Sequence, residues 1–252
     1  MRSRGLAAVC ALAGLGAFGA SSALAVQPVF YSVAAVGQTV GPQEFAGTLG
    51  STVLEPRGDA SNGGLIICNG GGTISGEVVS STAIDNVVAV IVGCGVSGGK
   101  CNSPGEAEGV VETEALEAVI GNIPGSTPKP GLRLFAAGEA GKEPKTGRIA
   151  EIECLGGVLN EVVTGSVVGT LSGAQGTSPD EGKFAASVKL AFSRTRAIQK
   201  PTTFLAGECG GAGNCGPEQL TGSINGTPEP MGLGANMTLK STPFASKLGF
   251  TK

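Results

Sequence analysis

The side chains of this sequence that could do acid–base chemistry are its carboxylates, because the chain contains no histidine. Glutamates crowd one segment, at Glu106, Glu108, Glu112, Glu114 and Glu117. On a strand, Glu112 and Glu114 would share a face, and so would Glu151 and Glu153. A pair of carboxylates could hydrolyse a glycoside or bind calcium. We favour the simpler interpretation of a solvated acidic edge, which also discourages edge-to-edge pairing of strands.

Cysteines are the second group with chemical potential. One of the seven, Cys10, lies in an apolar N-terminal segment, and the others are Cys68, Cys94, Cys101, Cys154, Cys209 and Cys215. An even number of cysteines behind an export signal predicts disulfides in an oxidising compartment. The cysteine spacings do not fit the two-to-four-residue gaps of zinc motifs. We therefore expect disulfides and no metal site.

The pairing of these cysteines is one of fifteen possibilities. Short separations favour Cys94–Cys101 and Cys209–Cys215, which leaves Cys68–Cys154. On the chain-entropy estimate, the long crosslink would contribute about 4.5 kcal/mol and each short loop about 2.5 kcal/mol. We therefore predict that loss of Cys68 or Cys154 lowers the melting temperature more than loss of Cys209.

One serine motif resembles the nucleophile turn of hydrolases but lacks a base. Gly95-Val96-Ser97-Gly98-Gly99 matches the pattern. Ser97 would need a histidine, and it lies between two cysteines in a stretch that its glycines predict to be a loop. We therefore predict no catalytic residue and no cofactor, and we expect that the protein is not an enzyme.

The N-terminus has the pattern of a secretory signal peptide. Arg2 and Arg4 precede an apolar stretch, and Ala23-Leu24-Ala25 is a small-x-small cleavage pattern. We place the signal peptide at residues 1–25 and a single extracellular domain at residues 26–252; an uncleaved membrane anchor is the alternative. No later segment is apolar for long enough to cross a bilayer. The expected location is extracellular or the cell envelope.

Composition restricts the partners of the mature chain. Removing Arg2 and Arg4 leaves 15 basic against 20 acidic residues, a net charge of −5. This charge argues against binding to nucleic acid or to an anionic membrane. With no tryptophan and one tyrosine, the chain has few aromatic faces for stacking sugars or bases. The partner is unknown, and a component of the cell envelope or an extracellular polymer is the kind we consider.

Short apolar or alternating runs, separated by Gly, Pro, Ser and Asn, must position these groups. The run from Phe184 to Ser193 alternates apolar with polar or small residues, which predicts a strand. Ser103 to Ile120 could instead form a helix, but Gly105 and Gly109 weaken its start, and we favour a strand for Val110 to Ile120. The fold class we predict is all-β: a single-domain sandwich or partly closed barrel, crosslinked by disulfides.

Several short segments resemble uncharacterised secreted proteins of soil actinobacteria. They span roughly residues 90 to 240 and are Cys101-Asn102-Ser103-Pro104-Gly105, Glu112-Thr113, Ala115-Leu116, Gly131-Leu132-Arg133-Leu134, Ala150-Glu151-Ile152-Glu153-Cys154, Val163-Thr164-Gly165-Ser166-Val167-Val168-Gly169 and Gln199-Lys200-Pro201-Thr202. This family has no assigned activity, so the resemblance implies a secreted β protein and no site.

Together these features favour a secreted, non-enzymatic protein with a structural, cell-surface or binding role. One alternative is a secreted hydrolase of the glycoside type, with Glu112, Glu114, Glu151 and Glu153 as the paired carboxylates. Another is an adhesion module supported by calcium, although the sequence contains no aspartate-rich calcium loop.

Overall fold

The computed structural model describes residues 30–32, 43–56, 64–173, 175–176, 187–209, 214–224, 226–241 and 248–251. The predicted signal peptide, residues 1–25, lies outside these ranges. Within them, no helix has the length and apolar character that a membrane span requires.

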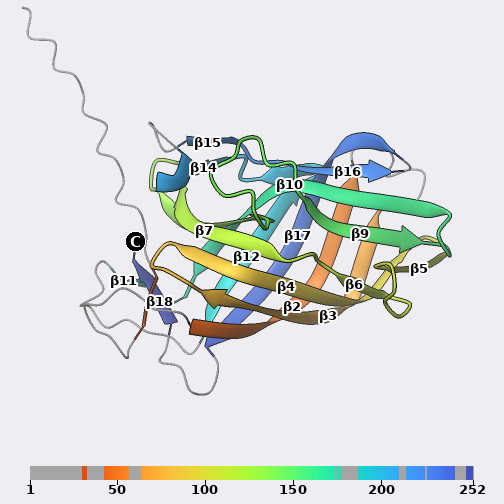
Figure 1. Ribbon diagram of the computed structural model, residues 1–252, viewed down its shortest axis with the longest axis horizontal. Coiled ribbons are helices and arrows are strands. Elements are labelled where there is room, and N and C mark those ends of the chain that lie inside the picture. Colours follow the sequence, from red (N-terminus) through yellow and green to blue (C-terminus); the bar gives the residue numbers. More distant parts are fainter. Residues whose placement is uncertain are drawn as a thin grey trace, which may run out of the picture.

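The described chain is built almost wholly from strands (Figure 1). The large sheet contains β2 (Gln43–Pro56), β3 (Ile66–Val78), β4 (Ala83–Val96), β5 (Gly99–Asn102), β6 (Val110–Glu112), β7 (Leu116–Ile123), β8 (Lys129–Ala136), β9 (Arg148–Cys154), β10 (Leu159–Ser172), β12 (Val188–Thr195), β13 (Ile198–Lys200), β14 (Thr203–Leu205), β15 (Asn214–Pro217), β16 (Leu220–Ile224) and β17 (Thr227–Ser241). A small sheet joins β1 (Phe30–Ser32), β18 (Leu248–Thr251) and β11 (Gln175–Gly176), and a 3-10 turn, η3, covers Gly207–Cys209.

The large sheet is antiparallel and returns on itself. Its pairings follow the path β12–β17–β2–β3–β4–β7–β8–β10 and then back to β12. The last ladder is short, because β10 meets β12 only at Thr170–Ser172, and the β4–β7 ladder has a register shift. The result is a single sheet partly closed into a ring, but not a barrel. The predicted all-β, disulfide-crosslinked fold is confirmed.

The strands expected from the sequence are found where the structure describes them. The predicted strand from Phe184 to Ser193 is observed from Val188 onward as β12, and its first residues lie outside the described ranges. The segment from Val110 to Ile120 forms the strands β6 and β7 rather than a helix. In β10 the register shifts at Val163/Thr164, next to Gly165. Gly165 has φ 100°, a conformation that disfavours other residues.

The inside of the ring is the main apolar core, drawn from strands all around it, with Leu49, Ile74, Val87, Val163 and Leu190 among its members. A second, smaller core lies on the outer face of β7, β8 and β10, where Phe135 packs with Phe204 and Cys215. The strand β8 is therefore buried on both faces: Leu132 and Leu134 belong to the inner core, and Phe135 belongs to the outer one.

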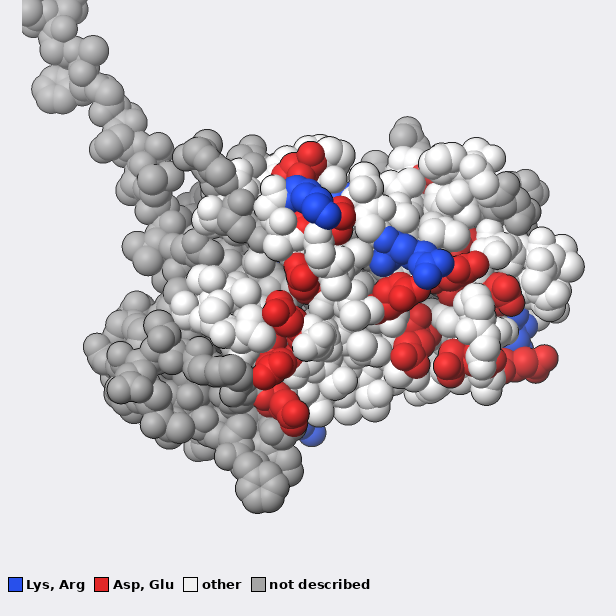
Figure 2. Space-filling view, viewed as in Figure 1, with Lys and Arg blue, Asp and Glu red and all other residues white. Residues whose placement is uncertain are grey.

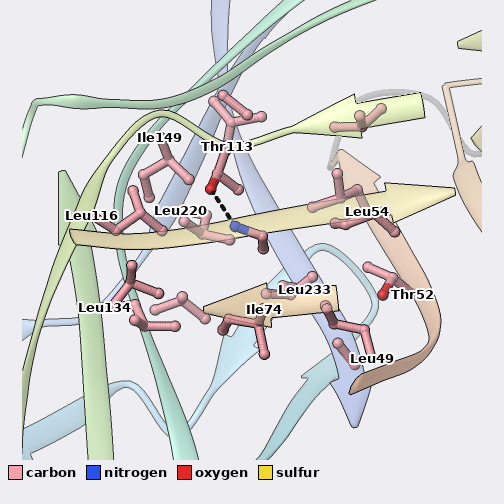
Figure 3. A pocket seen from close by; sticks show the side chains of 18 of the residues that line it. Leu49, Thr52, Leu54, Ile74, Thr113, Leu116, Leu134, Ile149, Leu220 and Leu233 are labelled. Atoms are coloured by element: carbon pink, nitrogen blue, oxygen red, sulfur yellow. Dashed lines mark hydrogen bonds between the residues drawn. The ribbon is translucent and has the colours of Figure 1, made fainter. Parts of the chain in front are cut away.

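A cavity of about 70 Å³ remains inside the ring (Figure 3). Apolar side chains such as Leu116, Leu134 and Leu220 line it. Thr113 also lines the cavity. Its hydroxyl accepts a hydrogen bond from the N–H of Ala89 at 3.0 Å. Ligand pockets usually measure roughly 300–1,000 Å³. The cavity is therefore a packing gap in the core.

The described residues form three disulfides, and two of the pairings differ from those expected. Cys209–Cys215 is confirmed. The structure joins Cys68 to Cys94 and Cys101 to Cys154, so the predicted Cys94–Cys101 and Cys68–Cys154 bonds are wrong. The reason is strand register: Cys68 lies opposite Cys94 in the β3–β4 ladder, and Cys101 lies opposite Cys154 in the β5–β9 ladder. Three disulfides indicate an oxidising environment.

Candidate functional site

An acid-lined surface pocket of about 300 Å³ lies beside β6 and β9. Its carboxylates come from Glu106, Glu112, Glu114 and Glu151, and Arg148 is the one cation among its described lining residues. Figure 2 shows acidic side chains gathered around basic ones in this region. The structure thus brings together three of the four glutamates that the sequence predicted as paired carboxylates.

Ser103 organises the wall of the acid-lined pocket. Its side chain is buried, and its Oγ lies 2.9 Å from the carbonyl oxygen of Glu151 and 3.0 Å from that of Glu112. The same Oγ accepts a hydrogen bond from the Glu112 N–H at 3.1 Å. One buried hydroxyl therefore ties β6 to β9 and fixes the distance between the two strands that carry the glutamates. No helix cap is formed there, in contrast to the helical alternative for this segment.

Arg148 neutralises two of the pocket's carboxylates. Its Nη2 lies 2.6 Å from Glu114 Oε1, and its Nη1 lies 2.8 Å from Glu151 Oε2. These side chains are partly exposed, and ion pairs in such positions contribute little to stability. Glu153 does not line the pocket; it lies two residues further along β9 than Glu151, opposite Asn102 and Asn160. Within the described residues, no group of three potential ligands could hold a metal ion.

A second acidic feature is a row of carboxylates across four neighbouring strands. Glu44 on β2 lies opposite Glu77 on β3, and Glu77 lies opposite Asp85 on β4. Burial and the charge of Glu117 on β7 raise the pKa of Asp85. Figure 2 shows the corresponding column of acidic side chains over β7, β4, β3 and β2. We call Glu44, Glu77, Asp85 and Glu117 the acidic row.

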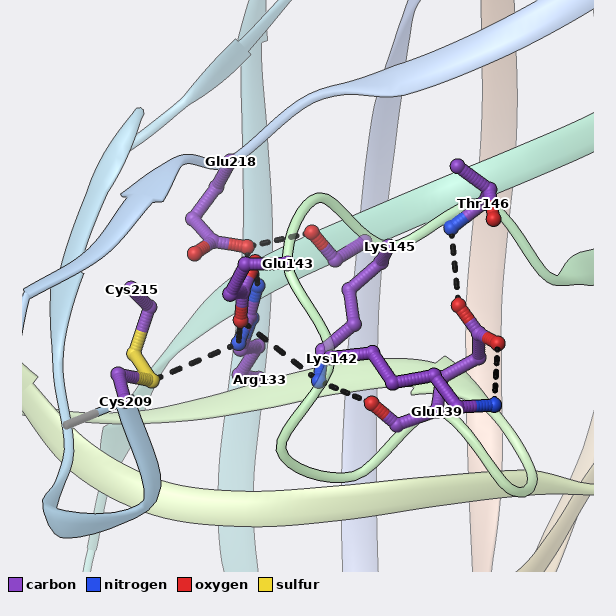
Figure 4. A network of polar contacts seen from close by, with 10 residues as sticks. Arg133, Glu139, Lys142, Glu143, Lys145, Thr146, Cys209, Cys215 and Glu218 are labelled. Atoms are coloured by element: carbon purple, nitrogen blue, oxygen red, sulfur yellow. Dashed lines mark hydrogen bonds and ion pairs between the residues drawn. A yellow bond between two sulfur atoms is a disulfide. The ribbon is translucent and has the colours of Figure 1, made fainter.

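A buried ionic cluster occupies the outer face of β8 and β10 (Figure 4). Arg133, which is 1% exposed, donates from Nε to Glu218 Oε2 at 2.8 Å. It also makes a two-pronged contact with Glu143, at 2.5 and 2.9 Å. Ser166 on β10 donates to Glu218 Oε2 at 2.5 Å. We call Arg133, Glu143, Lys145, Ser166 and Glu218 the Arg133 cluster.

The Arg133 cluster joins the loop after β8 to the segment after β15. Lys145 Nζ lies 4.0 Å from the ring centre of Phe135 and donates to the carbonyl of Glu139 at 2.5 Å. Burial lowers the pKa of Arg133, but the hydrogen bonds and charges of Glu143 and Glu218 more than offset this, and the net pKa is raised. Burial raises the pKa of Glu218, and Arg133 opposes that rise. The arrangement is a buried ion-pair network that links these two segments.

Glu161 on β10 is a second buried charge site among the described residues, and it faces the inner core. It is 0% exposed, and neither of its carboxyl oxygens has a hydrogen-bond partner among the described residues. Burial, and secondarily the charge of Glu229 on β17, raise the pKa of Glu161 to about 7. This carboxyl is therefore substantially protonated near neutral pH.

Arg133, Glu161 and Glu218 were not among the functional candidates expected from the sequence. The available signal was a single charge inside an apolar run, as in Leu132-Arg133-Leu134. A charge in such a run indicates a strand that is covered on both faces. Ser97 lies, as expected, in the loop between β4 and β5.

No family model matches this chain, and neither a curated protein nor a solved structure is found to match it. The resemblance to secreted actinobacterial proteins therefore stays a prediction.

Proposed function

We propose that the protein is a secreted, non-enzymatic binding protein whose acidic row holds a cationic partner, such as a basic component of the cell envelope or an extracellular polymer. The predicted signal peptide and the disulfides support export. The observation that carries the proposal is the acidic row, because it places like charges directly opposite one another on a rigid sheet.

Like charges in directly opposed positions weaken a sheet, by roughly 0.2–1 kcal/mol for each pair. Glu77, Asp85 and Glu117 make no ion pair with any described residue. A bound cationic chain would relieve this repulsion along the whole row. Neighbouring strands are about 4.8 Å apart, so the row would offer a line of negative charge to a repeating basic polymer.

Binding to immobilised poly-lysine, measured against salt concentration, tests this proposal. We expect retention that weakens with salt and that falls at least tenfold when the row is neutralised by Glu44→Gln, Glu77→Gln, Asp85→Asn and Glu117→Gln. The matched control removes the same charge from the acid-lined pocket, with Glu106→Gln, Glu112→Gln, Glu114→Gln and Glu151→Gln. Equal losses in both variants would mean that net charge alone drives binding and would contradict a site on the row.

A hydrolase with paired carboxylates is the second candidate, because the acid-lined pocket collects Glu112, Glu114 and Glu151. The ion pairs of Arg148 with Glu114 and Glu151 count against it, since they occupy two of the three carboxylates. We expect no turnover in a broad glycoside screen. Turnover that Glu112→Gln abolishes would replace the binding proposal with this one.

Calcium-supported adhesion has less support, since the described residues hold no group of three potential metal ligands. We expect the melting temperature to stay unchanged in millimolar calcium. A rise on adding calcium that a chelator reverses would favour adhesion instead.

A further inference from the structure

The strand β16 is held between β10 and β17 by two antiparallel ladders. Glu161 on β10 lies opposite Ile224, and Glu229 on β17 lies opposite Gly222. Gly222 also lies opposite Val163, which belongs to the inner core. Directly opposed residues share a face, so Glu161 and Glu229 flank β16 on its inner side.

Gly222 leaves the space that the carboxyl of Glu161 fills. A Cβ atom at Gly222 would collide with Glu161 Oε1 and lie 2.6 Å from the terminal methyl of Met231. The carboxyl therefore packs over the backbone of β16, against an apolar side chain. Neither of its oxygens has a hydrogen-bond partner among the described residues.

No cation faces Glu161 from the described strands around it. The strand β16 (LTGSI) carries no titratable side chain, and β17 contributes Glu229. On β9 the opposed residue is Ile152, and Glu151 and Glu153 alternate onto the other face of the sheet. Among the described residues of these strands, an ionised Glu161 would thus meet the negative charge of Glu229 and no cation.

We propose that Glu161 and Glu229 form a pH-sensitive latch that holds β16 when Glu161 is protonated and releases it from β10 when Glu161 ionises. Release frees the edge of β10 between Glu161 and Gly165 and removes Leu220 from the inner core. The latch regulates access to one edge of the sheet and is independent of the acidic row.

The direction of the pH response follows from burial. Folded Glu161 has its pKa raised to about 7, whereas the released side chain returns toward its ordinary value of 4.5. The docked strand therefore keeps its full stability at acidic pH, loses it as the pH rises from about 4.5 to about 7, and changes little above that. From pH 5 to pH 8 these values correspond to a rise of at least about tenfold in the opening equilibrium.

Hydrogen exchange of the β16 amides at pH 5 and pH 8, corrected for the intrinsic pH dependence, tests the latch. We expect the opening equilibrium to rise at least tenfold in the native protein, and less than twofold in Glu161→Gln, which cannot ionise. Glu153→Gln, on the other face of β9, is the matched control and should keep the native response. Glu229→Gln should move the response to lower pH.

Equal pH responses in the native protein and Glu161→Gln would overturn the latch. So would a native β16 whose exchange does not change with pH, or a response shared equally by β2 and β3. If Glu161→Gln does not fold, Glu161→Met supplies an apolar side chain of similar length and should also abolish the response.

Discussion

Among the described residues, two glutamates are fully buried, Glu218 and Glu161, and they lie on opposite faces of the same sheet in opposite electrostatic surroundings. Glu218 is held by Arg133 and Ser166 at 2.8 and 2.5 Å. Glu161 has no hydrogen-bond partner among the described residues and meets the charge of Glu229. Burial raises the pKa of both, but the cation beside Glu218 opposes that rise.

The two sites therefore have different roles, one structural and one dependent on pH. The Arg133 cluster fastens a loop and a late segment to the outer face, and breaking it should unfold that face. The carboxyl of Glu161 needs to be neutral to stay buried, so the strand beside it depends on pH. A buried charged side chain therefore holds two segments together only when a counter-charge is buried beside it.

Removing the cation of the Arg133 cluster should have the largest effect. Arg133→Met leaves the charge of Glu218 buried without its cation, which we expect to lower the free energy of unfolding by about 4 kcal/mol. Urea unfolding at pH 7 measures this. Adding Glu218→Gln should recover part of the loss, because the uncompensated charge is then gone. A loss below about 1 kcal/mol would show that the cluster does not hold the loop and the segment after β15 to the sheet.

The disulfides of the two faces should rank by loop length. Cys101–Cys154 closes a separation of 53 residues and Cys209–Cys215 one of 6. Replacing both cysteines of a pair by serine should cost about 4 kcal/mol for the inner bond and about 2.5 kcal/mol for the outer one. Thermal unfolding with peptide mapping of the remaining bonds measures the order. A Cys94–Cys101 crosslink in the native protein would contradict the β3–β4 and β5–β9 registers.

The pH dependence of stability should separate the two glutamates. Raising the pKa of Glu161 from 4.5 to about 7 corresponds to about 3 kcal/mol of stability that is lost between those values as the pH rises. Urea unfolding of the native protein and Glu161→Gln at pH 5 and pH 8 isolates this share. Between pH 5 and pH 8, the free energy of unfolding of the native protein should fall by about this amount more than that of Glu161→Gln. Equal changes in the two proteins would assign the pH dependence to other groups.

The exposed ion pairs of the acid-lined pocket should matter least. Arg148→Ala removes contacts to Glu114 and Glu151, whose side chains are partly exposed. We expect a change of less than about 1 kcal/mol in the free energy of unfolding. A loss as large as that of Arg133→Met would remove the distinction between buried and exposed ion pairs.

Much of the fold could be predicted from local patterns. Alternation and turn residues predicted an all-β protein, and the cysteine count predicted disulfides. The Cys68–Cys94 and Cys101–Cys154 bonds could not be predicted from spacing, because each depends on the register of a ladder between strands. Sequence separation alone favours the shorter loop, and that preference holds only for Cys209–Cys215.

The candidate site was predictable where the carboxylates are close in sequence. Glu112 and Glu114 belong to one segment, and their pocket adds Glu151 from β9. Arg133 could not be found by alternation, because β8 is covered on both faces and the rule assumes that one face is wet. Glu229, whose charge acts on Glu161, lies on β17, nearly seventy residues away along the chain, so no local pattern links the two.

The contrast between the two buried glutamates can be measured by a carbon-13 NMR titration of the glutamate side-chain carboxyls, which reports the protonation of Glu161 and Glu218 separately. We predict that Glu161 titrates with a midpoint near 7 and that Glu218, where Arg133 opposes the effect of burial, titrates below Glu161. The Glu161 signal would be assigned by its loss in Glu161→Gln. A midpoint for Glu161 near 4.5, or one below that of Glu218, would show that Glu161 is not kept neutral by its burial.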